Sequence, residues 1–145
     1  ENLVANYSRE NLGFILLGSH VGGFDVLQYL TSKYGQAKIM MDVSHNSMIT
    51  DILYSLNPVM FNAIIDANSD NVLLKIKESL DESRFVAILA DRNISNQKKV
   101  NLSLLGDEIS IAKFPFTIAH VLKKPVVVFL EYTKAAMNMK FILKN

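Results

Sequence analysis

The segment Phe14-Ile-Leu-Leu-Gly-Ser-His-Val-Gly-Gly-Phe-Asp25 joins a short apolar run to a glycine-rich turn that carries two ionisable side chains. The apolar run predicts a strand over residues 12–17 that is buried on both faces, since a half-exposed strand would alternate apolar and polar residues. The glycines allow a tight turn after it. The segment therefore places His20 at a strand-to-helix corner and Asp25 in the first turn of the helix.

The rest of the chain repeats this alternation of strand and helix. Apolar residues spaced by three or four predict amphipathic helices, and short apolar runs predict buried strands. Residues 1–11 form a short helix or lead-in, and residues 100–105 and 108–111 form a hairpin around a Gly-Asp turn. The remaining strands are expected over residues 38–43, 62–66, 84–90, 126–132 and 139–143, and the helices over residues 24–34, 48–56, 70–82 and 115–122.

Two of these helices carry more specific expectations. Ser69 or Asp70 would cap the third helix, whose inner face would hold Val72, Leu73, Ile76 and Leu80. Pro115 suits the first turn of the fourth helix. That helix is apolar nearly all round, which predicts that it is buried and that His120 is a packing residue.

The order of elements predicts an α/β fold with a mostly parallel central sheet flanked by helices. A chain of 145 residues is long enough for one domain with a real core, so residues 1–145 are expected to be a single domain, excised from a longer chain. The apolar content of 50% argues against disorder. Without cysteine, disulfides and a thiol nucleophile are excluded.

The net charge of +1 conceals an asymmetry between the two parts of the chain. Residues 1–91 carry 6 basic and 11 acidic side chains, whereas residues 92–145 carry 9 basic and 3 acidic ones. The second part is therefore a candidate surface for phosphates, phospholipid headgroups or an acidic carrier protein, or it is simply a solvated face. No apolar run reaches the roughly 18 residues typical of a membrane-spanning helix.

Polar side chains follow three of the predicted strands. His20 follows the first strand, His45 and Asn46 follow the second, and Asp91 and Arg92 follow the strand over residues 84–90. Sites in parallel sheets form at the carboxyl ends of the strands, so these groups could converge on one pocket. His45 could instead belong to a helix cap, and Arg92 could simply pair with a carboxylate.

His20 and Asp25 are the residues best suited to acid–base chemistry. An imidazole, with an ordinary pKa near 6.5, can accept a proton near neutral pH, and a carboxylate on its other nitrogen fixes the tautomer. The backbone N–H groups around Gly22 and Gly23 could stabilise an oxyanion or bind a phosphate. The alternative is a capping aspartate and a turn histidine without a catalytic role.

The nucleophile is not obvious in this sequence. Ser19 precedes His20 directly, and adjacent residues on an extended segment point to opposite sides, which is a poor geometry for proton transfer. The Gly-x-Ser-x-Gly elbow of α/β-hydrolases is also absent. Direct attack by a substrate hydroxyl, activated by His20, is the better interpretation.

The block Gly18-Ser-His-Val-Gly-Gly-Phe-Asp25 resembles the Gly-x-His-x-Gly-Asn-Trp-Glu/Asp block of the bacterial lipid A (lauroyl/myristoyl) acyltransferases and their relatives in the glycerolipid (lysophospholipid) acyltransferase superfamily. Three later segments, residues 86–92, 104–106 and 118–128, resemble further blocks of that family in the same order. The resemblance covers about residues 12–132.

The resemblance implies transfer of a fatty acyl group from acyl carrier protein or coenzyme A to a hydroxyl of a lipid or glycolipid. His20 would be the general base and Asp25 its orienting partner, and Asp91 and Arg92 would lie in the substrate site. It further implies no bound cofactor or metal, no nucleic-acid partner, and work at the cytoplasmic face of the bacterial inner membrane.

The chain departs from the family pattern in two places. Gly23 and Phe24 stand where Asn and Trp are common, and Lys113-Phe114 stands where a small residue and glycine are usual, so the oxyanion and donor contacts near Lys113 are open. A second hypothesis is a non-catalytic nucleotide- or phosphate-binding module that uses the Gly22-Gly23 turn, although the sequence has neither a complete Gly-x-Gly-x-x-Gly nor a P-loop lysine. An ester hydrolase is the third.

Overall fold

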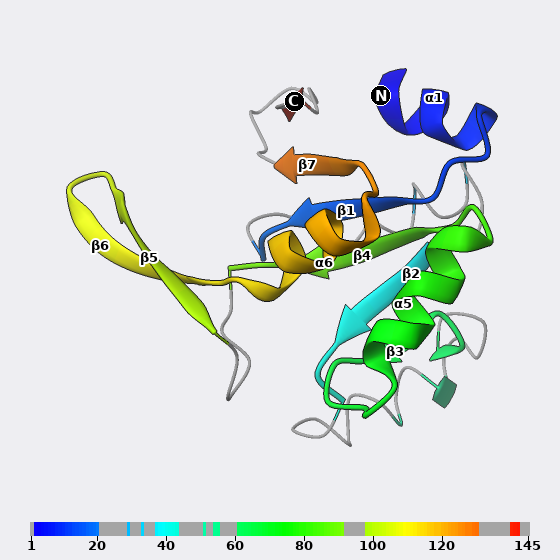
Figure 1. The fold of residues 1–145 in the computed structure, drawn as a ribbon, viewed down its shortest axis with the longest axis horizontal. Helices are drawn as coiled ribbons and strands as arrows, with labels where there is room; N and C mark the ends of the chain where they lie inside the picture. The colour runs from blue at the N-terminus through cyan, green and yellow to red at the C-terminus, as the bar shows by residue number, and fades with distance from the viewer. Residues whose placement is uncertain are drawn as a thin grey trace.

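The computed structural model describes residues 2–20, 29, 33, 37–43, 51, 54–55, 61–91, 98–130 and 140–142. Six strands form one sheet in the order β3-β2-β4-β1-β7-β8, and β5 pairs with β6 in a separate hairpin (Figure 1). The elements are α1 Asn2–Arg9, β1 Phe14–Gly18, β2 Ala37–Met41, β3 Ile64–Asp66, α5 Val72–Asp81, β4 Phe85–Leu89, β5 Lys99–Leu104, β6 Asp107–Ala112, α6 Phe114–Leu122, β7 Val126–Leu130 and β8 Lys140–Ile142.

The first five strands of this order run parallel, and only β8 is antiparallel to its neighbour β7. The predicted α/β class with a mostly parallel central sheet is therefore confirmed. Each described strand begins and ends within two residues of its predicted range. Most of the predicted helices over residues 24–34 and 48–56 lies outside the described residues, although Tyr29, Lys33, Asp51 and Tyr54 are helical.

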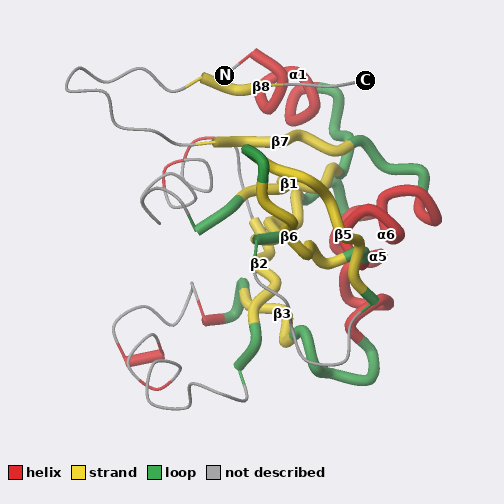
Figure 2. Tube along the Cα trace, turned by 90° about the vertical axis from the view of Figure 1, so that its left-hand side faces the viewer, coloured by secondary structure: helices red, strands yellow, loops and turns green. Residues whose placement is uncertain are grey.

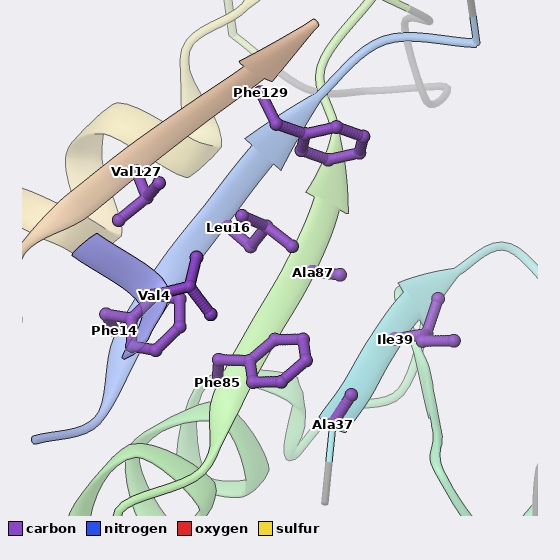
Figure 3. Packing of buried hydrophobic residues seen from close by; sticks show 9 residues of the cluster. All are labelled: Val4, Phe14, Leu16, Ala37, Ile39, Phe85, Ala87, Val127 and Phe129. Atoms are coloured by element: carbon purple, nitrogen blue, oxygen red, sulfur yellow. The ribbon is translucent and has the colours of Figure 1, made fainter. Parts of the chain in front are cut away.

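Apolar side chains cover both faces of the sheet, which explains why its central strands read as continuous apolar runs. Side chains alternate along each strand, so neighbouring residues enter different clusters. Figure 3 shows the first cluster, made of Val4, Phe14, Leu16, Ala37, Ile39, Phe85, Ala87, Val127 and Phe129. The second cluster contains Ile15, Leu17, Met40, Ile65, Ile76, Leu80, Val86, Ile88 and Ile118.

The helices divide between these two faces. Val4 brings α1 into the first cluster, where the rings of Tyr7 and Phe14 lie 5.6 Å apart. Ile76 of α5 and Ile118 of α6 belong to the second cluster. Figure 2 shows α5 and α6 together on one side of the sheet. The described part of the domain is thus a sheet between helices, as predicted.

Two expectations about α5 are wrong. The residue at its N-cap is Asn71 rather than Ser69 or Asp70, and no side chain of the described residues caps the helix. Leu73 is 57% exposed rather than on the inner face. Leu73 shares the helical face of Leu80, seven residues further on, but it lies in the first turn of α5, which is less covered than the turns that carry Ile76 and Leu80.

The expectation that α6 is buried all round is also wrong. Pro115 does lie in its first turn, as predicted, and is buried together with Ile118. On the other side, however, Phe116 and Val121 are 46% and 67% exposed, and His120 is exposed rather than packed. Composition indicated burial, but α6 covers the sheet with one side only.

The β5–β6 hairpin forms with a turn one residue earlier than predicted. Leu104 pairs with Asp107, so the two turn residues are Leu105 and Gly106 rather than Gly106 and Asp107. Both turn residues have positive φ, 55° for Leu105 and 94° for Gly106. Such a turn matches the right-handed twist of the strands, and this match favours the observed register.

Candidate active site

Two central strands of the sheet carry the candidate site at their carboxyl ends. β1 and β4 are parallel neighbours, and Gly18 is in register with Leu89. The backbone N–H of Ala90 donates to the carbonyl oxygen of Gly18 at 2.9 Å, which extends the pairing past the strand ends. His20 and Asp91 each lie two residues beyond the Gly18–Leu89 pair, so the parallel register brings them side by side.

Asp91 contacts His20 with both carboxylate oxygens. The backbone N–H of His20 donates to Oδ2 at 2.7 Å. The imidazole Nδ1 lies 2.7 Å from Oδ1. One carboxylate therefore holds the main chain and the ring of the same histidine, which fixes the ring's orientation relative to the end of the sheet.

The contact at Nδ1 determines what the other ring nitrogen can do. A carboxylate accepts hydrogen bonds, so in the neutral imidazole the proton belongs on Nδ1 and Nε2 is the acceptor. The side chains of His20 and Asp91 are 37% and 35% exposed, so the pair lies at the surface of the described residues. The arrangement is that of a general base with an orienting carboxylate.

The pKa of Asp91 reflects its contacts with His20. Burial by itself raises the pKa of this carboxyl. The hydrogen bonds from the ring and the backbone of His20, together with the charge of the imidazolium, lower the pKa by more, so that it lies below the ordinary value. Asp91 is therefore a carboxylate at neutral pH and can stabilise a positive imidazole.

A close packing contact supports the strand that leads to the site. The ring of Phe129, on β7, lies against Gly18, and a Cβ at Gly18 would approach that ring to less than 3.0 Å. A larger side chain at the end of β1, two residues before His20, would therefore have to displace this ring. Phe129 belongs to the first apolar cluster, so the position of the site is tied to the core.

Most of the other predicted site residues lie outside the described residues. These are Gly22, Gly23, Asp25, His45, Asn46 and Arg92. The predicted pairing of His20 with Asp25 consequently remains a prediction, and Asp91 is the carboxylate found on Nδ1. Lys113 is described at the junction of β6 and α6, where its backbone N–H donates to the carbonyl of Lys98 at 2.9 Å.

The role of Asp91 as the partner of His20 was not recognised from the sequence. Asp91 was expected among the substrate contacts, because its position after a strand was visible but the identity of the neighbouring strand was not. The available signal was that each residue follows a buried apolar run within three residues. That signal becomes decisive only when β1 and β4 are known to be neighbours.

A second polar cluster lies along the same edge of the sheet and was also missed. The side-chain amide of Asn68 donates to Asp42 at 2.8 Å, and its backbone N–H donates to Asp66 at 3.0 Å. Asp42 follows β2 and Asp66 ends β3, and these strands are neighbours. Each carboxylate accepts a hydrogen bond from Asn68, so the cluster joins two loops.

Two properties of the described residues bear on possible ligands and on the membrane. No group of three or more histidine, aspartate or glutamate side chains among these residues is arranged to hold a metal ion. Among the same residues, no helix has the length and apolar character needed to cross a membrane.

Comparisons with known proteins give no assignment. No protein-family model matches the sequence. No curated protein matches it either.

Proposed function

We propose that this protein is an O-acyltransferase that moves a fatty acyl group from an acyl thioester to a hydroxyl of a lipid or glycolipid. The observation that carries the proposal is the double contact between Asp91 and His20, at 2.7 Å from the backbone N–H and 2.7 Å from Nδ1. An acyl transfer without a protein nucleophile needs a base that is fixed in orientation and open to the acceptor. His20 meets both requirements.

In the proposed reaction, Nε2 of His20 removes the proton of the acceptor hydroxyl as its oxygen attacks the thioester carbonyl. The tetrahedral intermediate then collapses, the carbon–sulfur bond breaks, and the imidazolium returns the proton to the departing thiolate. Asp91 holds the ring through Nδ1 and stabilises its positive charge during the reaction. Backbone N–H groups near Gly22 and Gly23 are proposed to stabilise the oxyanion.

The donor is proposed to be acyl carrier protein or coenzyme A carrying the acyl group, with no bound cofactor. The acceptor is proposed to be a lipid at the cytoplasmic face of the bacterial inner membrane. These parts of the proposal rest on the block at residues 18–25 and on the later segments that resemble the acyltransferase family. The basic excess of residues 92–145 suits an acidic carrier or an anionic membrane.

The proposal can be tested by following thiol release from an acyl thioester in the presence of a lipid extract from the native host. Mass spectrometry of the extract identifies the acylated product. Wild-type protein should release thiol and form an ester in matched amounts, and His20→Ala should slow both by about 10²- to 10⁴-fold. His120→Ala is the matched control, because it removes an exposed histidine on α6.

The products also discriminate between alternative functions. Thiol release that does not depend on the lipid and yields free fatty acid would indicate a thioester hydrolase. Normal ester formation by a correctly folded His20→Ala variant would contradict the assignment of the base. Phosphate or nucleotide binding without acyl transfer, lost on substitution of Gly23 but retained in His20→Ala, would favour a non-catalytic binding module.

A further inference from the structure

The β5–β6 hairpin has one apolar face. Side chains directly opposite each other in an antiparallel pair lie on the same face. The register therefore places Val100 beside Ile111 and Leu102 beside Ile109. The opposite face is polar, and there the hydroxyl of Ser110 donates to the side-chain oxygen of Asn101 at 3.0 Å.

This hairpin stands away from the described core. Figure 1 shows it reaching out from the side of the domain towards which the arrowheads of β1 and β7 point. That side carries the carboxyl ends of the parallel strands, where His20 and Asp91 lie. Both Leu102 and Leu104 are exposed, at 44% and 54%. An apolar face of this kind usually marks a contact surface.

The tip of the hairpin also carries an exposed apolar side chain. Leu105 is 98% exposed and has a φ of 55°. Asn, Asp or Gly is favoured at this position of the turn, because a leucine side chain is strained at positive φ. The chain therefore has an exposed leucine at the place where folding alone favours a small polar residue.

The root of the hairpin is basic. Lys98 and Lys113 are joined there by a backbone hydrogen bond of 2.9 Å, and Lys99 follows directly. All three lysines are exposed. The two carboxylates of the hairpin, Asp107 and Glu108, lie at its other end, beside the turn. An apolar face with cations at one end is suited to a surface that has an apolar interior and anionic groups above it.

We infer that the β5–β6 hairpin docks on a lipid bilayer that contains anionic phospholipids. Its apolar face and Leu105 enter the interface, and Lys98 and Lys113 at the root approach the headgroup phosphates, whereas Lys99 belongs to the polar face with Asn101. Asp107, opposite Leu104, limits how deeply the tip inserts, so the hairpin lies along the surface. This inference deepens the proposed function, since docking brings the edge that carries His20 to a lipid acceptor.

Vesicle flotation with the whole protein tests this inference. The vesicles are phosphatidylethanolamine with about one quarter phosphatidylglycerol, compared with pure phosphatidylcholine. Wild-type protein should bind the anionic vesicles more tightly. Leu105→Asn should weaken binding by about tenfold, as expected for one leucine in contact with lipid. Asparagine accepts positive φ, so this variant should fold at least as stably as the wild type.

Matched variants separate the faces of the hairpin. Ser103→Asn, on the polar face, should leave vesicle binding unchanged. Lys98→Gln combined with Lys113→Gln should remove the preference for anionic vesicles. Circular dichroism and the urea midpoint show that each variant is folded.

Three results would overturn the inference. The first is absence of wild-type binding to anionic vesicles. The second is unchanged binding by Leu105→Asn. In the third, Leu105→Asn dissociates a dimer in sedimentation without affecting flotation, which would assign the apolar face to a second copy of the chain.

Docking and catalysis are tested separately, because His20→Ala should bind vesicles as tightly as the wild type. If the wild type acylates a dispersed acceptor but does not float, only the docking inference fails. If it floats but shows no acyl transfer, only the proposed function fails.

Discussion

The ring of Phe129 lies against Gly18, in the space that a side chain at position 18 would occupy. A Cβ built on Gly18 would approach the ring atoms to less than 3.0 Å. Phe129 is buried among the residues of the first apolar cluster, so its ring is not free to move aside. The contact joins the end of β1, and hence the approach to His20, to the packing of β7.

Gly18→Ala should therefore destabilise the protein by about 1–3 kcal/mol, as expected for overpacking in a core. Urea unfolding measures this change. The double variant Gly18→Ala/Phe129→Leu should be more stable than the sum of the two single changes predicts, because the smaller side chain makes room for the methyl group. Additive effects of the two substitutions would show that the ring does not fill this space.

Asp91→Asn should lower kcat for acyl transfer by about 10²- to 10⁴-fold. An asparagine amide cannot accept from both the ring and the backbone N–H of His20, so the orientation of the ring is lost. Asp25→Asn is the informative comparison, since the resemblance assigns the orienting role to Asp25. If only Asp25→Asn impairs kcat, the contact between Asp91 and His20 is structural.

Asp91 should also make stability depend on pH in the acid range. Folding lowers the pKa of Asp91, so its stabilising contribution is complete above the ordinary aspartate range near pH 4 and disappears as the pH falls through the folded-state pKa. The difference in unfolding free energy between wild type and Asp91→Asn should therefore shrink between about pH 6 and pH 3. Thermal unfolding at both pH values measures it, with Glu108→Gln as an exposed control.

The sequence allowed the class of fold to be predicted because each buried strand is a continuous apolar run. Leu16 and Val86 are completely or almost completely buried, and the runs that contain them could be recognised without any knowledge of their neighbours. Strand order could not be predicted in the same way, since nothing local to β1 specifies that β4 rather than β2 lies beside it. The partnership of His20 and Asp91 depends on that order.

Surface exposure was the property that composition predicted least well. Val121 and Leu73 are apolar residues on helices and were expected to be buried, yet both are mostly exposed. Val121 lies off the face of α6 that is buried, whereas Leu73 shares the face of Leu80 but lies in the less covered first turn of α5. The hairpin turn was displaced for a related reason, because the backbone twist selected Leu105-Gly106 over the equally plausible Gly106-Asp107.

The middle and the first turn of α5 should respond very differently to truncation. Ile76→Ala should cost about 2–5 kcal/mol, since Ile76 is fully buried in the second apolar cluster and its loss leaves a cavity. Leu73→Ala should change stability by less than about 0.5 kcal/mol, because this side chain is mostly exposed. Urea unfolding of both variants measures the contrast. Comparable costs would place Leu73 in a packed contact.

Gly13→Ala should destabilise the protein strongly, because the space beside Gly13 is filled by the backbone of Leu80 at the end of α5. A Cβ at Gly13 would overlap the carbonyl group of Leu80, and a backbone cannot move aside as a side chain can. We expect a loss of about 3 kcal/mol or more in the free energy of unfolding.

Gly106→Ala is the matched control, because the space around Gly106 is open and its φ of 94° is the only source of strain. That substitution should cost about 1–2 kcal/mol. A smaller loss for Gly13→Ala than for Gly106→Ala, measured by urea unfolding, would contradict the close approach of α5 to the start of β1.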